Sequence, residues 1–203
     1  TGAGFHNATA SATATATANG NRRYFRSSEG SLSVTARSAD GTGSGHYAGD
    51  HFDLARLDVE RIVREAVGKA VQSRNPRRIE PGVYPVILEP QAVGDLMTLV
   101  AFYADARSAD EGRSPSVKTG GGNKIGEKIA DDRVSFYSDP YDPKILADPF
   151  DGEGFPLTRR NWIDKGVLKE LQYGRFWAKK QGKQPTGSPN NVVMTGGSTT
   201  RDQ

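Results

Sequence analysis

Residues 86–103, VILEPQAVGDLMTLVAFY, decide how the second half of this chain folds. The stretch opens with a short apolar run, turns at Pro90, and then places apolar residues three and four positions apart. That spacing builds one buried face of an α-helix, and proline suits a first helical turn. We therefore predict a strand over Val83 to Leu88, followed by a helix that ends near Tyr103. Its predicted buried positions are Val93, Leu96, Met97, Val100 and Tyr103.

The composition favours a soluble protein. The 203 residues are 35% hydrophobic and 25% charged, with a mean hydropathy of -0.62. No apolar run approaches the ~20 residues that span a bilayer, and the start TGAGFHNATA lacks the basic and apolar regions of a secretory signal. The chain has no cysteine, which excludes disulfides and thiolate sites. Its net charge of +3 is close to balance and does not predict nucleic-acid binding.

The first 45 residues carry the two-residue period of β-strands. Threonine and alanine alternate through residues 13–18, and Asn19-Gly20 then signals a tight turn. Two further β-rich runs follow, at Tyr24 to Ser27 and at Ser31 to Ala36. We predict an antiparallel meander that ends in a flexible, glycine-rich loop over residues 41–45.

Residues 58–73 change to the apolar spacing of an amphipathic helix, with Glu/Lys and Glu/Arg pairs on its other face. Asn75-Pro76 ends this helix, because the residue before proline is displaced from helical geometry. The following RNPRRIEPG reads as a connector. It divides the chain into two predicted regions, residues 1–78 and residues 79–203.

The second region is predicted to be rich in strands. Strands are expected at residues 133–138, 157–163 and 167–173, and Asp164-Lys165-Gly166 forms a hairpin turn between the last two. The tail over 179–203 is expected to be irregular, apart from a short apolar run at 192–194. The predicted fold class is α+β, with antiparallel sheets and two main helices.

Histidines offer a weak candidate for a metal site. His46 and His51 lie near Asp50 and Asp53 in the sequence. The two histidines are five residues apart, whereas two ligands on one helical face would be three or four apart. Ordinary loop histidines are the favoured interpretation. The glycine spacing of residues 121–128 resembles a phosphate-binding loop, yet Glu127 stands where that motif requires lysine.

Four segments, in order, resemble the TldD/PmbA family, also named modulators of DNA gyrase. The apolar segment over 86–103 is similar to the family's zinc-motif helix. SSEGSLSVTARSADGTGSG resembles its strand and glycine-rich loop, and GGGNKIGEKIADDRVSFYSDP its G-E-K turn and next strand. PFDGEGFPLTRRNWIDKGVLKELQYGRFWAKKQG resembles its acidic loop and hairpin. Together these segments cover most of residues 13–197.

The resemblance implies that the zinc motif is absent from this chain. Catalytic family members carry H-E-x-x-x-H, and the ungapped alignment places Thr98, Leu99 and Tyr103 at the His, Glu and His positions. A peptidase zinc requires about three imidazole or carboxylate ligands and a nearby carboxylate for the water's proton. We therefore predict no catalytic, cofactor or metal residue in this chain, although zinc can belong to a partner subunit.

The family resemblance also implies an architecture and partners. Residues 1–78 correspond to the C-terminal part of an N-terminal α/β domain, with the meander and the helix over 58–73. Residues 79–203 correspond to the first part of a β-rich C-terminal domain, which we expect to be truncated. Members form dimers around a closed chamber, so we expect a homodimer or a heterodimer with a TldD-like subunit, located in the cytoplasm and acting on peptide.

The favoured hypothesis is a non-metal-binding partner that shapes the peptide-processing chamber of a zinc peptidase. Its candidate peptide-binding residues are Asp151, Glu153, Arg159 and Arg160, because loops on a β scaffold commonly carry binding groups. One alternative is an active divergent metallopeptidase with ligands outside this segment or at the His46/His51 loop. The other is a gyrase-associated or nucleic-acid-binding modulator.

Overall fold

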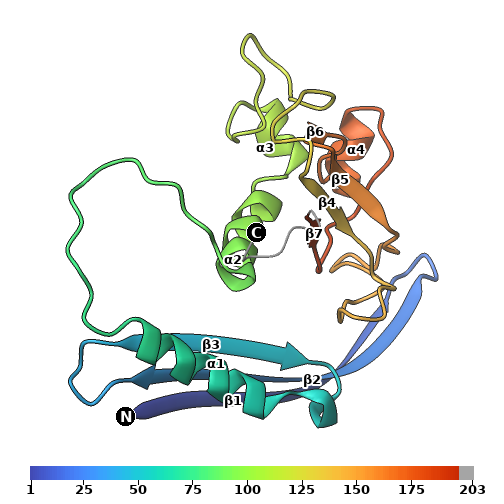
Figure 1. The fold of residues 1–203 in the computed structure, drawn as a ribbon. Coiled ribbons are helices and arrows are strands. Elements are labelled where there is room, and N and C mark those ends of the chain that lie inside the picture. The colour runs from blue at the N-terminus through green and yellow to red at the C-terminus, as the bar shows by residue number, and fades with distance from the viewer. Residues whose placement is uncertain (197–203) are drawn as a thin grey trace. The chain divides into compact units, whose positions relative to one another are not determined.

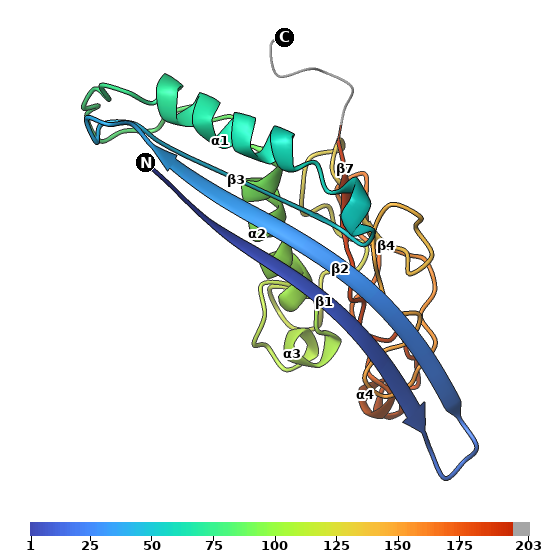
Figure 2. The same cartoon turned by 90° about the horizontal axis from the view of Figure 1, so that it is seen from below.

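The computed structural model describes residues 1–196, which form two compact units. The first unit contains residues 1–13 and 24–88, and the second contains residues 14–23 and those from 89 onward. Figure 1 labels the helices and strands, and Figure 2 shows the same ribbon turned by 90°. Both units combine helices with antiparallel strands, so the α+β class predicted from the sequence is confirmed.

A three-stranded sheet forms the base of the first unit. Its strands are β1 (Gly2–Ala16), β2 (Arg22–Arg37) and β3 (Ser44–His51), in that order. β2 and β3 are antiparallel, with Gly30 opposite His51 at one end and Arg37 opposite Ser44 at the other. The predicted meander is therefore present.

The strands are longer than the sequence pattern indicated. β1 begins at Gly2 rather than near residue 13, and the two runs predicted at 24–27 and 31–36 form one continuous strand. β3 occupies residues that were predicted to be a loop, so His46 and His51 are strand residues. Glycine weakens a strand pattern because it has no side chain to pack, and β3 contains Gly45 and Gly49.

α1 (Val59–Gln72) lies along β3, as Figure 2 shows, and confirms the helix predicted over 58–73. Asp58 caps its first turn by accepting a hydrogen bond from the Arg61 amide. Its three buried residues, four positions apart, are Ile62, Ala66 and Ala70. A 3-10 turn, η1 (Leu54–Arg56), precedes the helix.

Glycine lets α1 approach the sheet closely. A Cβ at Gly45 would lie 2.2 Å from the Ala66 carbonyl oxygen and 2.5 Å from the Ala70 amide nitrogen. Those atoms belong to the helix backbone, which cannot move aside like a side chain. The glycine and the two alanines therefore allow the helix to pack closely on the face of β3.

The strand predicted over Val83 to Leu88 is wrong. Residues 74–89 contain neither helix nor strand. The Val86 and Ile87 side chains are 72% and 77% exposed. An isolated apolar run gains nothing from strand geometry without a neighbouring strand, because cross-strand pairing supplies the stabilisation.

α2 (Pro90–Phe102) confirms the second long helix, with proline in its first turn. Its predicted buried face is wrong, because no residue of α2 is buried. Leu96 is 51% exposed and Leu99 is 55% exposed, whereas Met97 and Ala101 pack partly against the core of the second unit. The apolar pattern is present, but the described residues cover only one side of it.

A four-stranded antiparallel sheet organises the second unit. Its order is β6 (Val167–Leu168), β5 (Arg160–Asp164), β4 (Ser135–Ser138) and β7 (Val193–Thr195). The predicted strands at 133–138 and 157–163 correspond to β4 and β5, while the one at 167–173 is reduced to β6. The predicted turn is confirmed, with Lys165 and Gly166 at positive φ.

Two short helices, α3 (Ala106–Asp110) and α4 (Arg175–Lys180), complete the second unit. The predicted irregular tail therefore contains the end of α4 and also β7. Residues 197–203 of that tail lie outside the described residues. Among the residues that the structure describes, no helix combines the length and the apolar character needed to cross a membrane.

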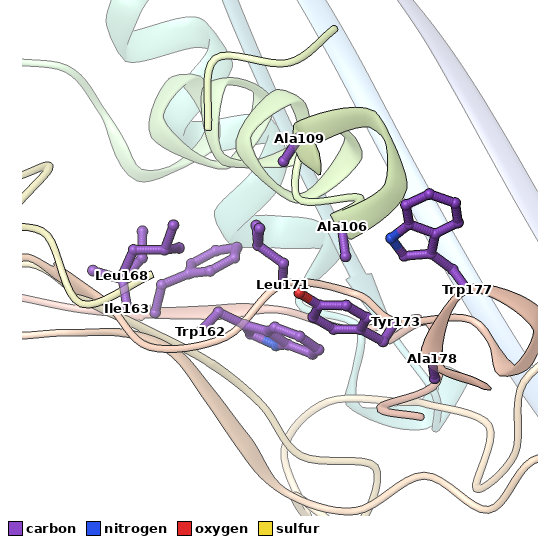
Figure 3. Packing of buried hydrophobic residues seen from close by; sticks show 10 residues of the cluster. Ala106, Ala109, Trp162, Ile163, Leu168, Leu171, Tyr173, Trp177 and Ala178 are labelled. Carbon is purple, nitrogen blue, oxygen red and sulfur yellow. The ribbon is translucent and has the colours of Figure 1, made fainter. Parts of the chain in front are cut away.

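The core of the second unit gathers residues from β4, β5, β6, α3 and α4. Figure 3 shows its side chains, among them Trp162, Leu171, Tyr173 and Trp177. The Trp162 Nε1 donates to Ser138 Oγ at 3.0 Å, and the Trp177 Nε1 donates to Asp110 Oδ2 at 2.8 Å. Both indole N–H groups therefore have partners, as buried donors require.

Candidate functional site

The side chains at the three positions aligned with the zinc motif contact neighbours on α2 or at its end. The Thr98 hydroxyl donates to the Gly94 carbonyl oxygen one turn earlier, at 3.1 Å. Leu99 is more than half exposed and carries no heteroatom. Tyr103 follows the last helical residue, and its ring packs edge-on against Phe102 with centroids 5.3 Å apart.

This donor set does not fit the zinc that the family resemblance implies. A hydroxyl bonded to its own helix and a phenol replace two imidazoles, and leucine cannot take a proton from water. Within residues 1–196, no group of three or more His, Asp or Glu side chains could hold a metal ion. Metal chemistry therefore has no suitable set of ligands on α2.

The two histidines of β3 do not form a site together. An odd separation along a strand places their side chains on opposite faces of the sheet. His46 Nδ1 lies 3.0 Å from Thr35 Oγ1, and His51 Nδ1 accepts a hydrogen bond from the Asp53 amide at 2.8 Å. Each ring is thus oriented by a different neighbour.

The acidic loop is a closed turn. Asp151 Oδ1 accepts hydrogen bonds from the Glu153 and Phe155 amides, at 3.0 and 2.9 Å. Gly154 adopts a φ of +70°, which favours glycine. The Asp151 carboxylate therefore shapes the loop itself. The Glu153 carboxylate is exposed and lies 3.6 Å from the Arg175 guanidinium.

Arg159 and Arg160 belong to different surroundings. Arg159 lies with its guanidinium 4.2 Å from the centroid of the Tyr137 ring and 3.4 Å from the Asp139 carboxylate. Arg160 begins β5 and donates through Nη1 to Glu170 Oε2 at 2.7 Å. Arg159 precedes β5 and Arg160 is its first residue, so the two side chains have different contacts.

The four candidate peptide-binding residues are thus divided among three sets of contacts. Asp151 and Glu153 belong to the closed turn, Arg159 lies beside Asp139, and Arg160 lies beside Glu170. Only Arg160 borders the groove of about 370 Å³ that is described further below. Peptide binding by the four residues stays a prediction.

Sequence reasoning missed two lysines of this groove, Lys169 and Lys183. They come from the segments after β6 and after α4, and nothing in local spacing joins them to Arg160. A signal for Glu170 was available, because the hairpin turn at 164–166 fixes an antiparallel register. Continued from the pair Ile163 and Leu168, that register brings Arg160 beside residues 170 and 171.

The largest pKa shifts among the described residues belong to two carboxylates in turns, Asp40 and Asp131. Hydrogen bonds from the Ser38 hydroxyl and from Thr42 hold the pKa of Asp40 well below its ordinary value. Hydrogen bonds from Arg133 lower the pKa of Asp131 to about 2. Both carboxylates are exposed and stabilise local loops, so their pKa shifts do not mark a catalytic centre.

Comparison with known families gives two matches that follow each other along the chain. A sequence model of the PmbA/TldA metallopeptidase central domain matches residues 3–74. A second model, of the PmbA/TldA metallopeptidase C-terminal domain, matches residues 81–203. The unmatched residues between them lie in the connector without helix or strand.

Individual relatives agree with these matches. A protein named metalloprotease from Methanothermobacter thermautotrophicus is 27% identical over 169 residues, which are 80% of this chain and 36% of the relative. The solved structure of a candidate modulator of a DNA gyrase from Thermotoga maritima gives a TM-score of 0.77 at 28% identity, over 89% of this chain and 43% of that one.

The structure of TldE from Thermococcus kodakarensis shares the fold, with a TM-score of 0.68 at 24% identity over 91% of this chain and 45% of that one. This chain spans less than half of the length of these three relatives. Because the C-terminal domain model alone covers more than half of its 203 residues, the chain belongs to the TldD/PmbA family.

Proposed function

We propose that this chain is the non-metal-binding partner in a zinc peptidase complex and shapes the chamber in which peptides are processed. The observation that carries the proposal is the side-chain set at Thr98, Leu99 and Tyr103, which offers no imidazole and no carboxylate. Zinc and the activated water would belong to a TldD-like subunit. This chain would contribute walls and binding groups.

The exposure of α2 supports the need for a partner. A helix that is apolar on all sides is normally buried, yet Leu96, Leu99 and Phe102 are each at least half exposed within this chain. Because exposed apolar patches mark interaction sites, this surface supports a partner that covers it in the working protein. A homodimer or a heterodimer with a TldD-like subunit, located in the cytoplasm, is the assembly that we propose.

The proposed domain arrangement follows the family. Residues 1–78 would belong to an α/β domain that corresponds to the family's central domain, and residues 79–203 would belong to a β-rich C-terminal domain. The substrate would be a peptide, because metallopeptidase is the activity in the family's description. Asp151, Glu153, Arg159 and Arg160 remain the proposed peptide-contacting residues.

The test is to purify this chain alone and together with a family member that carries H-E-x-x-x-H. Metal content and peptide cleavage are measured for both samples. We expect zinc and cleavage only with the second subunit, and we expect both to survive Thr98→Ala and Tyr103→Phe in this chain. Stoichiometric zinc and cleavage by this chain alone would overturn the proposal.

Two other outcomes identify the alternatives. Zinc that is lost after His46→Ala and His51→Ala would support a divergent metallopeptidase that uses those residues. Duplex DNA binding that persists at moderate salt would support a nucleic-acid-binding modulator. Binding that disappears at moderate salt would report only nonspecific charge attraction.

A further inference from the structure

A basic groove lies in the second unit where β5, the segment after β6 and the segment after α4 meet. Its volume is about 370 Å³, which lies within the usual range of small-ligand pockets. Arg160, Lys169 and Lys183 contribute three positive charges, and Glu170 contributes the single carboxylate among its lining residues. The groove therefore carries a net positive charge within a chain that is nearly balanced.

Arg160 leaves one hydrogen-bond donor unused. Its Nη1 donates to Glu170, whereas its Nε is buried and has no partner among the described residues. A buried N–H without an acceptor is destabilising, so an acceptor is expected beside it. The side chain as a whole is 24% exposed and borders the groove, although Nε itself is buried.

A water molecule can supply only part of what is missing. Arg160 also borders a cavity of about 10 Å³, the room that one water needs, beside the buried side chains of Ser138 and Asn191. A water there would accept from Nε. It would not offset the positive charge that remains after Glu170 pairs with Arg160, whereas an anionic oxygen would.

The two lysines are placed to bind that anion. Lys183 Nζ donates to the Tyr173 hydroxyl at 2.9 Å and lies 4.7 Å from the centroid of the same ring. An ammonium has three donors, so at least one remains for a ligand. Within residues 1–196, Lys169 has no carboxylate at ion-pair distance, and its charge is therefore not offset by a protein group.

The rest of the lining selects a carboxylate that is attached to an apolar group. Ile125 is half-buried and offers apolar surface beside the charges, and the buried side chains of Leu171 and Tyr173 also line the groove. Glu170 would repel a doubly charged phosphate more strongly than a singly charged carboxylate. An apolar side chain beside a single negative charge matches the end of a peptide.

We propose that this groove binds the carboxylate of a peptide, between Arg160, Lys169 and Lys183. The inference rests on the proposed function only in taking peptide as the ligand. The carboxylate can come from the C-terminus of the peptide or from an acidic side chain. Three otherwise identical apolar peptides separate these sources: one with a free C-terminus, one amidated, and one amidated with a glutamate.

Binding is measured on the whole chain by calorimetry and by the NMR resonance of the Arg160 Nε–H, assigned from its loss in Arg160→Lys. We expect the free-carboxyl peptide to bind at least about tenfold more tightly than the amidated one, as one charge-assisted contact implies. We also expect it to shift the Nε–H resonance. The glutamate peptide shows whether a side-chain carboxylate suffices.

Variants test the lysines. Lys183→Gln should weaken binding of the free-carboxyl peptide about tenfold and leave the amidated peptide unchanged, while Lys183→Arg should restore most of the affinity. Lys179→Gln is the matched control, because Lys179 is an exposed lysine of α4 that does not line the groove. It should bind like the unaltered chain.

Equal affinity for free and amidated peptides, or no peptide binding, would overturn the inference. Tighter binding of inorganic phosphate than of acetate would also overturn it, as would a resonance that responds to neither peptide. These readouts need no peptidase activity and no partner. If the two-subunit complex cleaves no peptide, the proposed function is wrong and this inference still stands. If the complex cleaves free and amidated peptides equally well and binds them with equal affinity, this inference is wrong and the proposed function still stands.

Discussion

α1 and α2 both show the apolar periodicity of a helix, although α1 has a charged face and α2 is apolar nearly all round, and the two have opposite surroundings. Both place apolar residues three and four positions apart, and both are regular helices of similar length. α1 buries Ile62, Ala66 and Ala70 against β3, whereas no residue of α2 is buried. Periodicity therefore predicted the helices correctly and could not identify where each apolar face finds its cover.

The difference lies in what each helix meets within this chain. Gly45 of β3 allows the α1 backbone to approach the sheet closely, and Ala66 and Ala70 of α1 pack against it. α2 follows an extended connector and packs partly against the second unit through Met97 and Ala101. α1 is thus stabilised by packing within the chain, whereas α2 is only partly covered by the described residues.

The largest effect is expected at the α1 contact with the sheet. Gly45→Val should destabilise the first unit by about 3 kcal/mol or more, because the new side chain would overlap backbone atoms of Ala66 and Ala70. Urea unfolding followed by far-ultraviolet circular dichroism measures the change. Unaltered stability would show that α1 does not lie on β3 in this way.

A second prediction compares one apolar residue from each helix. Ile62→Ala should cost about 2–4 kcal/mol, because Ile62 is 3% exposed and its loss leaves a cavity. Leu99→Ala should cost less than about 0.5 kcal/mol in the chain alone, as expected for an exposed position. Similar losses in both variants would contradict the contrast between the helices.

A third prediction uses the glycine inside each helix. A Cβ at Gly68 in α1 or at Gly94 in α2 would meet nothing within 4 Å. Replacement by alanine removes the entropic penalty of a helical glycine, about 0.5–1 kcal/mol. Gly68→Ala should therefore raise the global stability of the first unit. Gly94→Ala should mainly slow local hydrogen exchange in α2, and an equal global gain would indicate that α2 is well anchored.

The smallest effect is expected from Asp40, a carboxylate in the turn between β2 and β3. Arg74, just beyond α1, forms an ion pair with Asp40, whose pKa is lowered chiefly by the Ser38 hydroxyl. A lowered pKa in the folded state adds stability above the ordinary value of 3.8, and that stability is lost as the pH falls below it. Asp40→Asn should weaken the acid dependence of unfolding in the first unit, measured between neutral pH and about pH 2.

The sequence predicted elements better than it predicted their neighbours. The helix over 58–73, the meander and the hairpin at 164–166 follow from local patterns and turn residues, and all three are present. β3 was missed because Gly45 and Gly49 interrupt the alternating pattern typical of a strand. Both glycines lie against α1, where a side chain would crowd the helix. The strand at 83–88 was predicted wrongly because an apolar run says nothing about a missing pairing partner.

The candidate site shows the same limit. Arg160 could be selected from its loop, but the convergence of Arg160, Lys169 and Lys183 depends on tertiary packing. Asp151 was predicted as a binding residue together with Arg160, but its carboxylate accepts hydrogen bonds from amides of its own turn. Residue type and proximity in sequence were therefore insufficient to distinguish a binding group from a turn-forming one.

The positions of the two indoles give the molecule an intrinsic optical label. Trp162 and Trp177 are the only tryptophans in the sequence, and both belong to the second unit. Each indole is buried and donates a hydrogen bond, which fixes its environment until that unit opens. Tryptophan emission therefore reports the melting of one unit and is silent to the other, so a single unmodified sample reveals whether the two halves unfold together or in succession.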